Sequence, residues 1–247
     1  MTLDYLAVLM AGAVAGGFIN GLAGFGTALL ALGLWLQIMP AQQAVAVVVV
    51  MSVVSGLQGL WVIRREIRAR PGRLSRFLLP GLVGLPMGVT LLGMVSVLAL
   101  KLAIAGFMVA YGGFFSLRRS LPRFQRPTPV LDAGIGFVGG VLGGAASLSG
   151  ALPTMWCAMR PWPKGETRAV LQPYNVGILG VAVLLFALQG IYDRETLLLV
   201  GLALPGTLIG AQFGIALFHR LSDAQFRRLL ILVMFGSGLA LALRELV

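Results

Sequence analysis

The sequence has few of the residues that enzymes use for chemistry. Its 247 residues include one cysteine, Cys157, and one histidine, His219. A single cysteine excludes an internal disulfide and a cysteine-rich metal site. A catalytic serine needs a base to take its proton, and His219 stands beside basic residues at the end of an apolar segment. We therefore predict a protein that is not an enzyme and that uses no cofactor and no metal.

Acidic residues are also scarce, and we expect each of them at a helix end or in a loop. The eight are Asp4, Glu66, Asp132, Glu166, Asp193, Glu195, Asp223 and Glu245. Without a buried carboxylate or histidine the chain has no proton relay, which disfavours proton coupling. Coupling to sodium held by backbone carbonyls, and coupling to protons carried on a substrate, are the alternatives.

Basic residues outnumber acidic ones and give a formal net charge of +11. Sixteen of the 19 Lys and Arg fall in four short segments, which are Arg64 to Arg76, Arg118 to Arg126, Arg160 to Arg168 and Arg220 to Arg228. These segments flank apolar stretches instead of forming one basic face, so we exclude nucleic acid as a partner. Short loops rich in Lys and Arg stay cytoplasmic, and this bias sets topology.

Long apolar stretches dominate the chain, which is 58% hydrophobic and 11% charged. Stretches of 18 or more residues without charge are long enough to span a hydrocarbon core of ~30 Å. We predict an all-α, multi-pass protein of the bacterial inner membrane, in contact with the lipid bilayer. The expected spanning segments are 42–63, 74–95, 98–117, 169–190, 196–218 and 227–246.

Two glycine-rich runs interrupt the apolar sequence at matching places. The first extends from Gly16 to Thr27 and the second from Gly139 to Gly150, and a shift of 123 residues superposes them. Glycine weakens a helix by ~1 kcal/mol, so each run predicts a break. The segments after the breaks, 27–39 and 151–159, are too short to span. Paired interruptions in two halves of an apolar chain indicate a transporter binding site.

Charge placement predicts that the two halves have opposite orientations. With the basic loops inside, the unit from 129 to 168 starts and ends in the cytoplasm, while the first unit starts and ends outside. Each half is then one re-entrant, broken helical hairpin plus three transmembrane helices, which is an inverted structural repeat. The expected divisions are a first repeat at 1–121 with its hairpin at 3–39, a cytoplasmic linker at 122–130, and a second repeat at 131–247 with its hairpin at 131–160. Both termini are expected in the periplasm.

The glycine pattern resembles that of the sulfite exporter TauE/SafE family of membrane permeases. The resemblance rests on Gly16 to Gly26, its echo Gly139 to Gly150, the prolines Pro40 and Pro163, and the tail from Pro205 to Gly214. It covers essentially the whole chain and implies transport of small sulfur-containing anions such as sulfite, sulfoacetate and other organosulfonates. The sequence departs from the common pattern at the second break, where Ser147 and Ser149 stand opposite Gly24 and Gly26.

Helix N-termini that follow the two breaks could bind such an anion near the bilayer midplane, because their N–H groups carry partial positive charge. The expected substrate-binding residues are Asn20, Gly24, Gly26, Thr27, Ser147, Ser149, Arg168, Gln172, Tyr174 and Asn175. The last three follow Pro163 in an apolar segment, where polar side chains face protein or water. Tight glycine packing and helix-to-helix hydrogen bonds are the alternative roles.

Arg168 is expected just before the helix that begins near Ala169, either attracting anions at the cytoplasmic mouth or anchoring the topology. Together with Arg160 and Lys164 it forms an expected basic rim on the cytoplasmic side. The four tryptophans (Trp35, Trp61, Trp156 and Trp162) are expected at the membrane interfaces.

We thus predict a transporter, in the outward direction, for a small sulfur-containing anion. An importer or channel for another solute and a non-transporting membrane scaffold stay open, as do the coupling ion and a homodimeric state.

Overall fold

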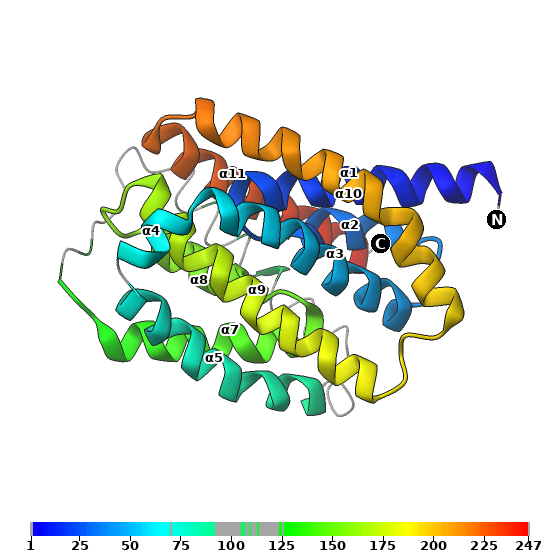
Figure 1. The fold of residues 1–247 in the computed structure, drawn as a ribbon, viewed down its shortest axis with the longest axis horizontal. Helices are drawn as coiled ribbons and strands as arrows, with labels where there is room; N and C mark the ends of the chain where they lie inside the picture. The colour runs from blue at the N-terminus through cyan, green and yellow to red at the C-terminus, as the bar shows by residue number, and fades with distance from the viewer. Residues whose placement is uncertain are drawn as a thin grey trace.

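The computed structural model describes residues 2–69, 71–91, 105–106, 109, 113, 124 and 126–246, and every regular element in these residues is helical. The helices are α1 (Leu3–Ala23), α2 (Thr27–Trp35), α3 (Ala41–Val62), α4 (Arg64–Ala69), α5 (Pro71–Leu91), α7 (Pro129–Ala146), α8 (Ala151–Ala158), α9 (Lys164–Leu188), α10 (Arg194–Arg220) and α11 (Asp223–Leu246). Within the described part of the chain, five of them (α1, α3, α5, α9 and α10) are long and apolar enough to cross a membrane. The protein is therefore an all-α, multi-pass membrane protein (Figure 1). The predicted span at 98–117 lies outside the described residues except at four positions.

α1 and α7 end inside the two glycine-rich runs, and these two ends match at the shift of 123 residues. α1 is followed by Gly24 with φ +86°, and α7 is followed by Ser147 with φ +57°. Both residues are in the left-handed region, which ends a helix and which glycine adopts at low cost. The next long helices, α3 and α9, both begin after a proline, Pro40 and Pro163.

Two pairs of helices pack so closely that glycines touch the opposing backbone. α1 lies parallel to α10, since Cβ atoms added at Gly17 and Gly21 would come within 2.1 Å of the carbonyl oxygens of Thr207 and Ala211. α5 lies parallel to α7 in the same way. There, Cβ atoms added at Gly140 and Gly144 would lie 2.0 and 2.5 Å from the carbonyl oxygens of Gly81 and Leu85. The two sets of contacts are equivalent: adding 123 to the α1 positions gives the α7 positions, and subtracting 126 from the α10 positions gives the α5 positions.

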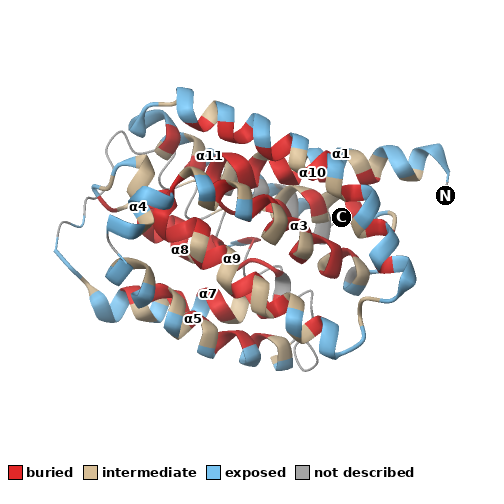
Figure 2. Ribbon diagram, viewed as in Figure 1, coloured by how far each residue is buried: buried red, intermediate tan, exposed pale blue. Residues whose placement is uncertain are grey.

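Helices α3 and α9 occupy the middle of the molecule, between the pair α1 and α10 and the pair α5 and α7 (Figure 1). They are antiparallel: Gly56 of α3 faces Val176, and Gly59 faces Gln172. Figure 2 shows that buried residues concentrate on these central helices and on the neighbouring α8. The polar residues after Pro163 therefore belong to a helix that other helices enclose.

Three of the expectations for local structure are wrong. α1 continues to Ala23, so most of the first glycine-rich run is helical and the break comes only at Gly24. α9 begins at Lys164 instead of near Ala169, which places Arg168 inside the helix, and Arg168 is fully buried. Trp35 and Trp156 are buried as well, with the indole of Trp35 donating to the carbonyl of Leu9 at 3.0 Å, so they are not interfacial anchors.

Candidate functional site at the two helix breaks

The two helix breaks touch each other. A Cβ atom added at Gly150, in the second break, would lie 2.6 Å from Cβ of Phe25 in the first break. The helices that follow, α2 and α8, have Gly26 and Gly150 as their N-terminal caps, and neither cap makes a side-chain hydrogen bond. Two helix N-termini without side-chain caps therefore lie at neighbouring breaks, and such ends favour anions.

The first break lies against the N-terminal half of α9. A Cβ atom at Gly24 would be 2.9 Å from Oε1 of Gln172 and 3.4 Å from Cγ of Arg168. Gly24 thus needs both its positive φ and its missing side chain, because any larger residue would push against α9. Gly26, with φ +97°, packs against Ile19.

Arg168 is buried with four of its five N–H donors unused. Its Nε donates to Oε1 of Gln172 at 3.0 Å, while its Nη1 and Nη2 have no hydrogen-bond partner. Its guanidinium carbon lies 4.4 Å from the ring centroid of Phe218. Gln172 in turn donates from Nε2 to the carbonyl of Gly56 at 3.0 Å. This chain of bonds holds the guanidinium in place and leaves its outer edge available.

The second break lies against the middle of α9. The hydroxyl of Ser149 donates to Oδ1 of Asn175 at 2.5 Å, and both residues are buried. Asn175 follows Arg168 by seven positions and Gln172 by three, so the three side chains share one face of α9. One face of one helix therefore contacts both breaks.

Asn20 connects the end of α1 to α3. Its Nδ2 donates to the carbonyl of Ser52 at 2.8 Å and to the hydroxyl of Ser55 at 2.7 Å. Its Oδ1 is buried and has no partner. Asn20 is therefore fixed in orientation, and its Oδ1 is an unused acceptor one helical turn before Gly24.

Unpartnered buried polar atoms concentrate at the breaks. Among the described residues, eight buried side-chain N or O atoms lack a hydrogen bond. Six of the eight belong to the breaks, the turns beside them or the adjoining face of α9: Asn20 Oδ1, Thr27 Oγ1, Ser147 Oγ, Thr154 Oγ1, Arg168 Nη1 and Arg168 Nη2. Leaving a buried polar group unpaired costs ~1–3 kcal/mol, and such groups in a native protein call for a bound partner or water.

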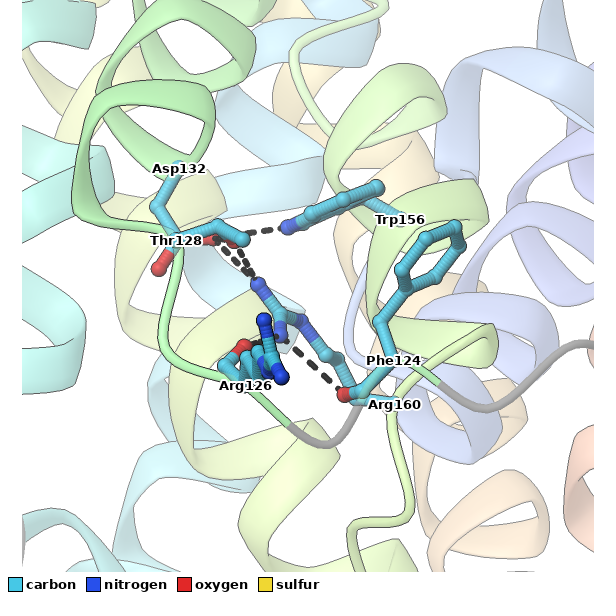
Figure 3. Close-up of polar contacts among 6 residues, drawn as sticks. All are labelled: Phe124, Arg126, Thr128, Asp132, Trp156 and Arg160. Carbon is cyan, nitrogen blue, oxygen red and sulfur yellow. Dashed lines mark hydrogen bonds and ion pairs between the residues drawn. The ribbon is translucent and has the colours of Figure 1, made fainter.

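A second polar cluster lies at the other end of the second hairpin, and Figure 3 shows its six residues. Asp132, in the first turn of α7, accepts from Nε1 of Trp156 at 2.7 Å and forms an ion pair with Arg160 at 3.1 Å. Arg160 also donates to Thr128 and to the carbonyls of Phe124 and Arg126. Asp132 is only 4% exposed. The expectation that no carboxylate is buried is therefore wrong, because α8 and the linker fold over this helix end.

The expected basic rim is also wrong in its details. Arg160 is buried in the cluster of Figure 3. The ammonium of Lys164 donates to the carbonyls of Phe218, His219 and Leu221 at the C-terminal end of α10. Both cations thus have internal partners, and Arg168 is buried in α9.

The sequence model of the family described as "Sulfite exporter TauE/SafE" matches residues 8–241. The chain belongs to the sulfite exporter TauE/SafE family. No curated protein and no solved structure matches it. Membership in this family indicates a membrane transporter of sulfur-containing anions, and it agrees with the glycine pattern from which the resemblance was drawn.

Within this TauE/SafE fold, eight of the residues singled out from the sequence divide into four groups. Gly24, Arg168 and Gln172 come together at the first break, and Ser149 and Asn175 come together at the second. Thr27 is the first residue of α2 and Ser147 follows the last residue of α7, and the hydroxyls of both are unpartnered. Tyr174 points to the other side of α9, where its hydroxyl donates to the carbonyl of Gly136 at 2.7 Å.

Sequence reasoning missed Ser52, Ser55, Phe218 and the pair Asp132 and Arg160. Ser52 and Ser55 were detectable as hydroxyl residues three positions apart in an apolar segment, which places them on one helix face. The ion pair joins residues 28 positions apart, and no local pattern marks such a contact.

Proposed function

We propose that the protein exports a small sulfur-containing anion, such as sulfite, sulfoacetate or another organosulfonate, and binds it between the two helix breaks. The observation that carries this proposal is Arg168: a fully buried guanidinium with Nη1 and Nη2 unpartnered, held beside Gly24 by Gln172. Its planar fork fits two oxygens of a sulfonate or sulfite group. Thr27, the N-terminus of α2 and the facing break at Ser147 to Gly150 are in position to supply further donors.

The proposal includes an inverted repeat of residues 1–121 and 131–247. Its support is that equivalent positions of the two halves make equivalent contacts. Gly17 contacts Thr207 and Gly21 contacts Ala211. At the corresponding positions of the other half, Gly140 contacts Gly81 and Gly144 contacts Leu85. Each half thereby packs its broken hairpin on a long helix of the other half. The antiparallel crossing of α3 and α9 agrees with opposite orientations of the halves.

The orientations of the helices support hairpins that enter from opposite sides of the membrane. α10 ends in the basic segment from Arg220 to Arg228, which the positive-inside bias places in the cytoplasm. α1 runs parallel to α10 and so begins in the periplasm, whereas α7 runs parallel to α5 and begins in the cytoplasm. In this arrangement Arg168, the fifth residue of α9, lies ~6 Å from the cytoplasmic end of its helix. The Arg168 end of the proposed site is then nearer the cytoplasm, and Asn175, seven residues farther along α9, lies ~10 Å deeper.

Export is the direction that membrane voltage favours. A potential that is negative inside drives each exported negative charge with ~2.3 kcal/mol per 100 mV. No second ion is needed for export, whereas concentrating an anion inward needs one. The test is anion flux from liposomes under a potassium-diffusion potential set by valinomycin. Flux that ignores the potential and follows a proton or sodium gradient would exclude this mechanism.

Binding is tested with purified protein in a thermal-shift screen against sulfite, sulfate, thiosulfate, sulfoacetate, taurine and simple carboxylates. At least one sulfur oxyanion is expected to raise the melting temperature. Arg168→Gln should weaken that ligand by roughly tenfold to a hundredfold, since a hydrogen bond to a charged group is worth ~1.5–3 kcal/mol. Arg220→Gln, which removes an exposed cation from α10, is the matched control and should leave the affinity unchanged. Stabilisation by none of the sulfur compounds would support a scaffold or a different solute.

A further inference from the structure

The charge balance around Arg168 points to the kind of anion that fits. We infer that the site selects singly charged oxyanions, such as an organosulfonate or hydrogensulfite, over doubly charged ones such as sulfate or sulfite. This inference rests on the proposed function, which places the anion at Arg168. It adds that the ligand's charge, and not its shape alone, decides whether it binds.

The guanidinium of Arg168 presents one defined edge to a ligand. Its Nε is occupied by Oε1 of Gln172 at 3.0 Å, and Gln172 is itself fixed to the carbonyl of Gly56. The free donors are therefore on Nη1 and Nη2 at the end of the side chain. Two parallel N–H groups bind two oxygens of one tetrahedral group, so Gln172 acts as a positioning residue and Arg168 makes the contact.

Arg168 has no internal counter-charge. Among the described residues no carboxylate lies within ion-pair distance of it, and its neighbours are the uncharged Gln172, the backbone of Gly24 and the ring of Phe218. The charged groups on the surrounding elements are directed elsewhere. Lys164, one turn earlier on α9, caps the carbonyls of α10, and Glu66 of α4 packs beside Gly165. His219 packs edge-on against the Phe218 ring.

One buried positive charge is neutralised by one negative charge. Among the side-chain charges, a singly charged oxyanion balances Arg168, whereas a doubly charged one leaves an excess negative charge away from water. Burying an unpaired charge is strongly unfavourable. The buried hydroxyls of Thr27 and Ser147 can donate hydrogen bonds to either ligand, so they do not offset the difference in charge.

Methanesulfonate and methylphosphonate test this inference because they share one tetrahedral shape. Methanesulfonate keeps a single charge, whereas phosphate-type groups acquire a second charge near neutral pH, at about 6 for phosphate esters. The affinities of both are measured by calorimetric titration of the purified protein, below and above the second ionisation of the phosphonate. We expect similar affinities below it and a loss on the order of tenfold or more for methylphosphonate above it. Methanesulfonate, whose charge is the same at both pH values, is the internal control for any effect of pH on the protein itself.

A matched variant tests the same inference by changing charge without changing size. Gln172→Glu places a carboxylate at Nε of Arg168 and should weaken methanesulfonate binding on the order of tenfold or more. Gln37→Glu, at an exposed position after α2, should have no effect. Full affinity for methanesulfonate in Gln172→Glu, or equal affinity for the doubly charged phosphonate, would overturn charge selection and leave the proposed function standing.

A different result would contradict the proposed function: the protein would bind none of methanesulfonate, sulfite and sulfoacetate. If sulfite binds and methanesulfonate does not, sulfite itself answers the question. Its affinity must then fall as hydrogensulfite loses its proton, and a constant or rising affinity would overturn the inference.

Discussion

Arg160 and Arg168 are eight residues apart in the sequence and both are buried, yet their surroundings differ in kind. Arg160, at the base of the second hairpin, contacts a carboxylate, a hydroxyl and two backbone carbonyls (Figure 3). Arg168, beside the first break, uses only its Nε and leaves Nη1 and Nη2 without partners. Both terminal nitrogens of Arg160 thus have acceptors and only its Nε is unpartnered, whereas both terminal nitrogens of Arg168 are unpartnered.

The difference shows that burial of a charge does not by itself distinguish structure from function. A buried cation whose terminal nitrogens have acceptors fixes the elements that supply them, here the segment around Phe124 to Thr128 and the first turn of α7. A buried cation whose outer edge has no acceptor lowers stability until a ligand supplies one. The two arginines should therefore respond to mutation in opposite ways.

The largest expected effect is on stability. Arg160→Met leaves Asp132 buried without its cation and should destabilise the protein by ~3–5 kcal/mol, because one partner of a buried ion pair is lost. Arg168→Met removes an incompletely paired charge and should leave stability unchanged or higher. The melting temperatures of the two variants in detergent, without ligand, measure the contrast.

Asp132→Asn is the control for that contrast, since it keeps an acceptor for Trp156 and removes the charge. Combined with Arg160→Met it should recover part of the lost stability. Equal melting temperatures for Arg160→Met and Arg168→Met would remove the distinction between the two sites.

The next effect concerns the hydroxyls of the two breaks. Ser149→Ala removes a hydrogen bond to Asn175 and should lower stability by ~1 kcal/mol. Thr27→Val is nearly isosteric and removes an unpartnered hydroxyl, so it should not lower stability. The order should reverse for ligand binding: Thr27→Val and Asn175→Ala should lower the affinity for the anion more than Ser149→Ala does. Thermal denaturation and ligand titration of the same preparations give both quantities.

The smallest effect is on labelling rather than on stability, and it tests the opposite orientations of the hairpins. Single cysteines at Gln42 and Val130, both exposed, should react with an impermeant maleimide from opposite sides of the membrane. Cys157 should not react, since it is 1% exposed and burial raises the pKa of its thiol. Reaction of both introduced cysteines from one side would contradict the inverted repeat.

The positions of the two breaks could be predicted from the sequence because glycine acts locally. The residues between α1 and α2 and between α7 and α8 belong to the ends of the two glycine-rich runs, and α3 begins directly after Pro40. Family membership followed from the same pattern. These features depend on backbone conformation, which neighbouring residues largely decide.

The distinction between Arg160 and Arg168 could not be predicted, because both belong to a short basic segment that reads as a cytoplasmic loop. Contacts distant in the sequence bury them: α7 and the linker cover Arg160, whereas Gly24 and Phe218 enclose Arg168. The prediction that α9 starts near Ala169 also placed Arg168 outside the helix, whereas α9 begins at Lys164. The burial of Trp35 and Trp156 has the same cause, a tertiary partner that no spacing rule supplies.

The most direct measurement of the central claim is flux of a sulfur oxyanion from proteoliposomes that contain equal amounts of wild-type, Arg168→Gln or Arg168→Lys protein. The account predicts saturable efflux from the wild type, loss of most efflux in Arg168→Gln, and partial activity in Arg168→Lys, which keeps the charge but not the fork. Efflux from Arg168→Gln at the wild-type rate and affinity would contradict it.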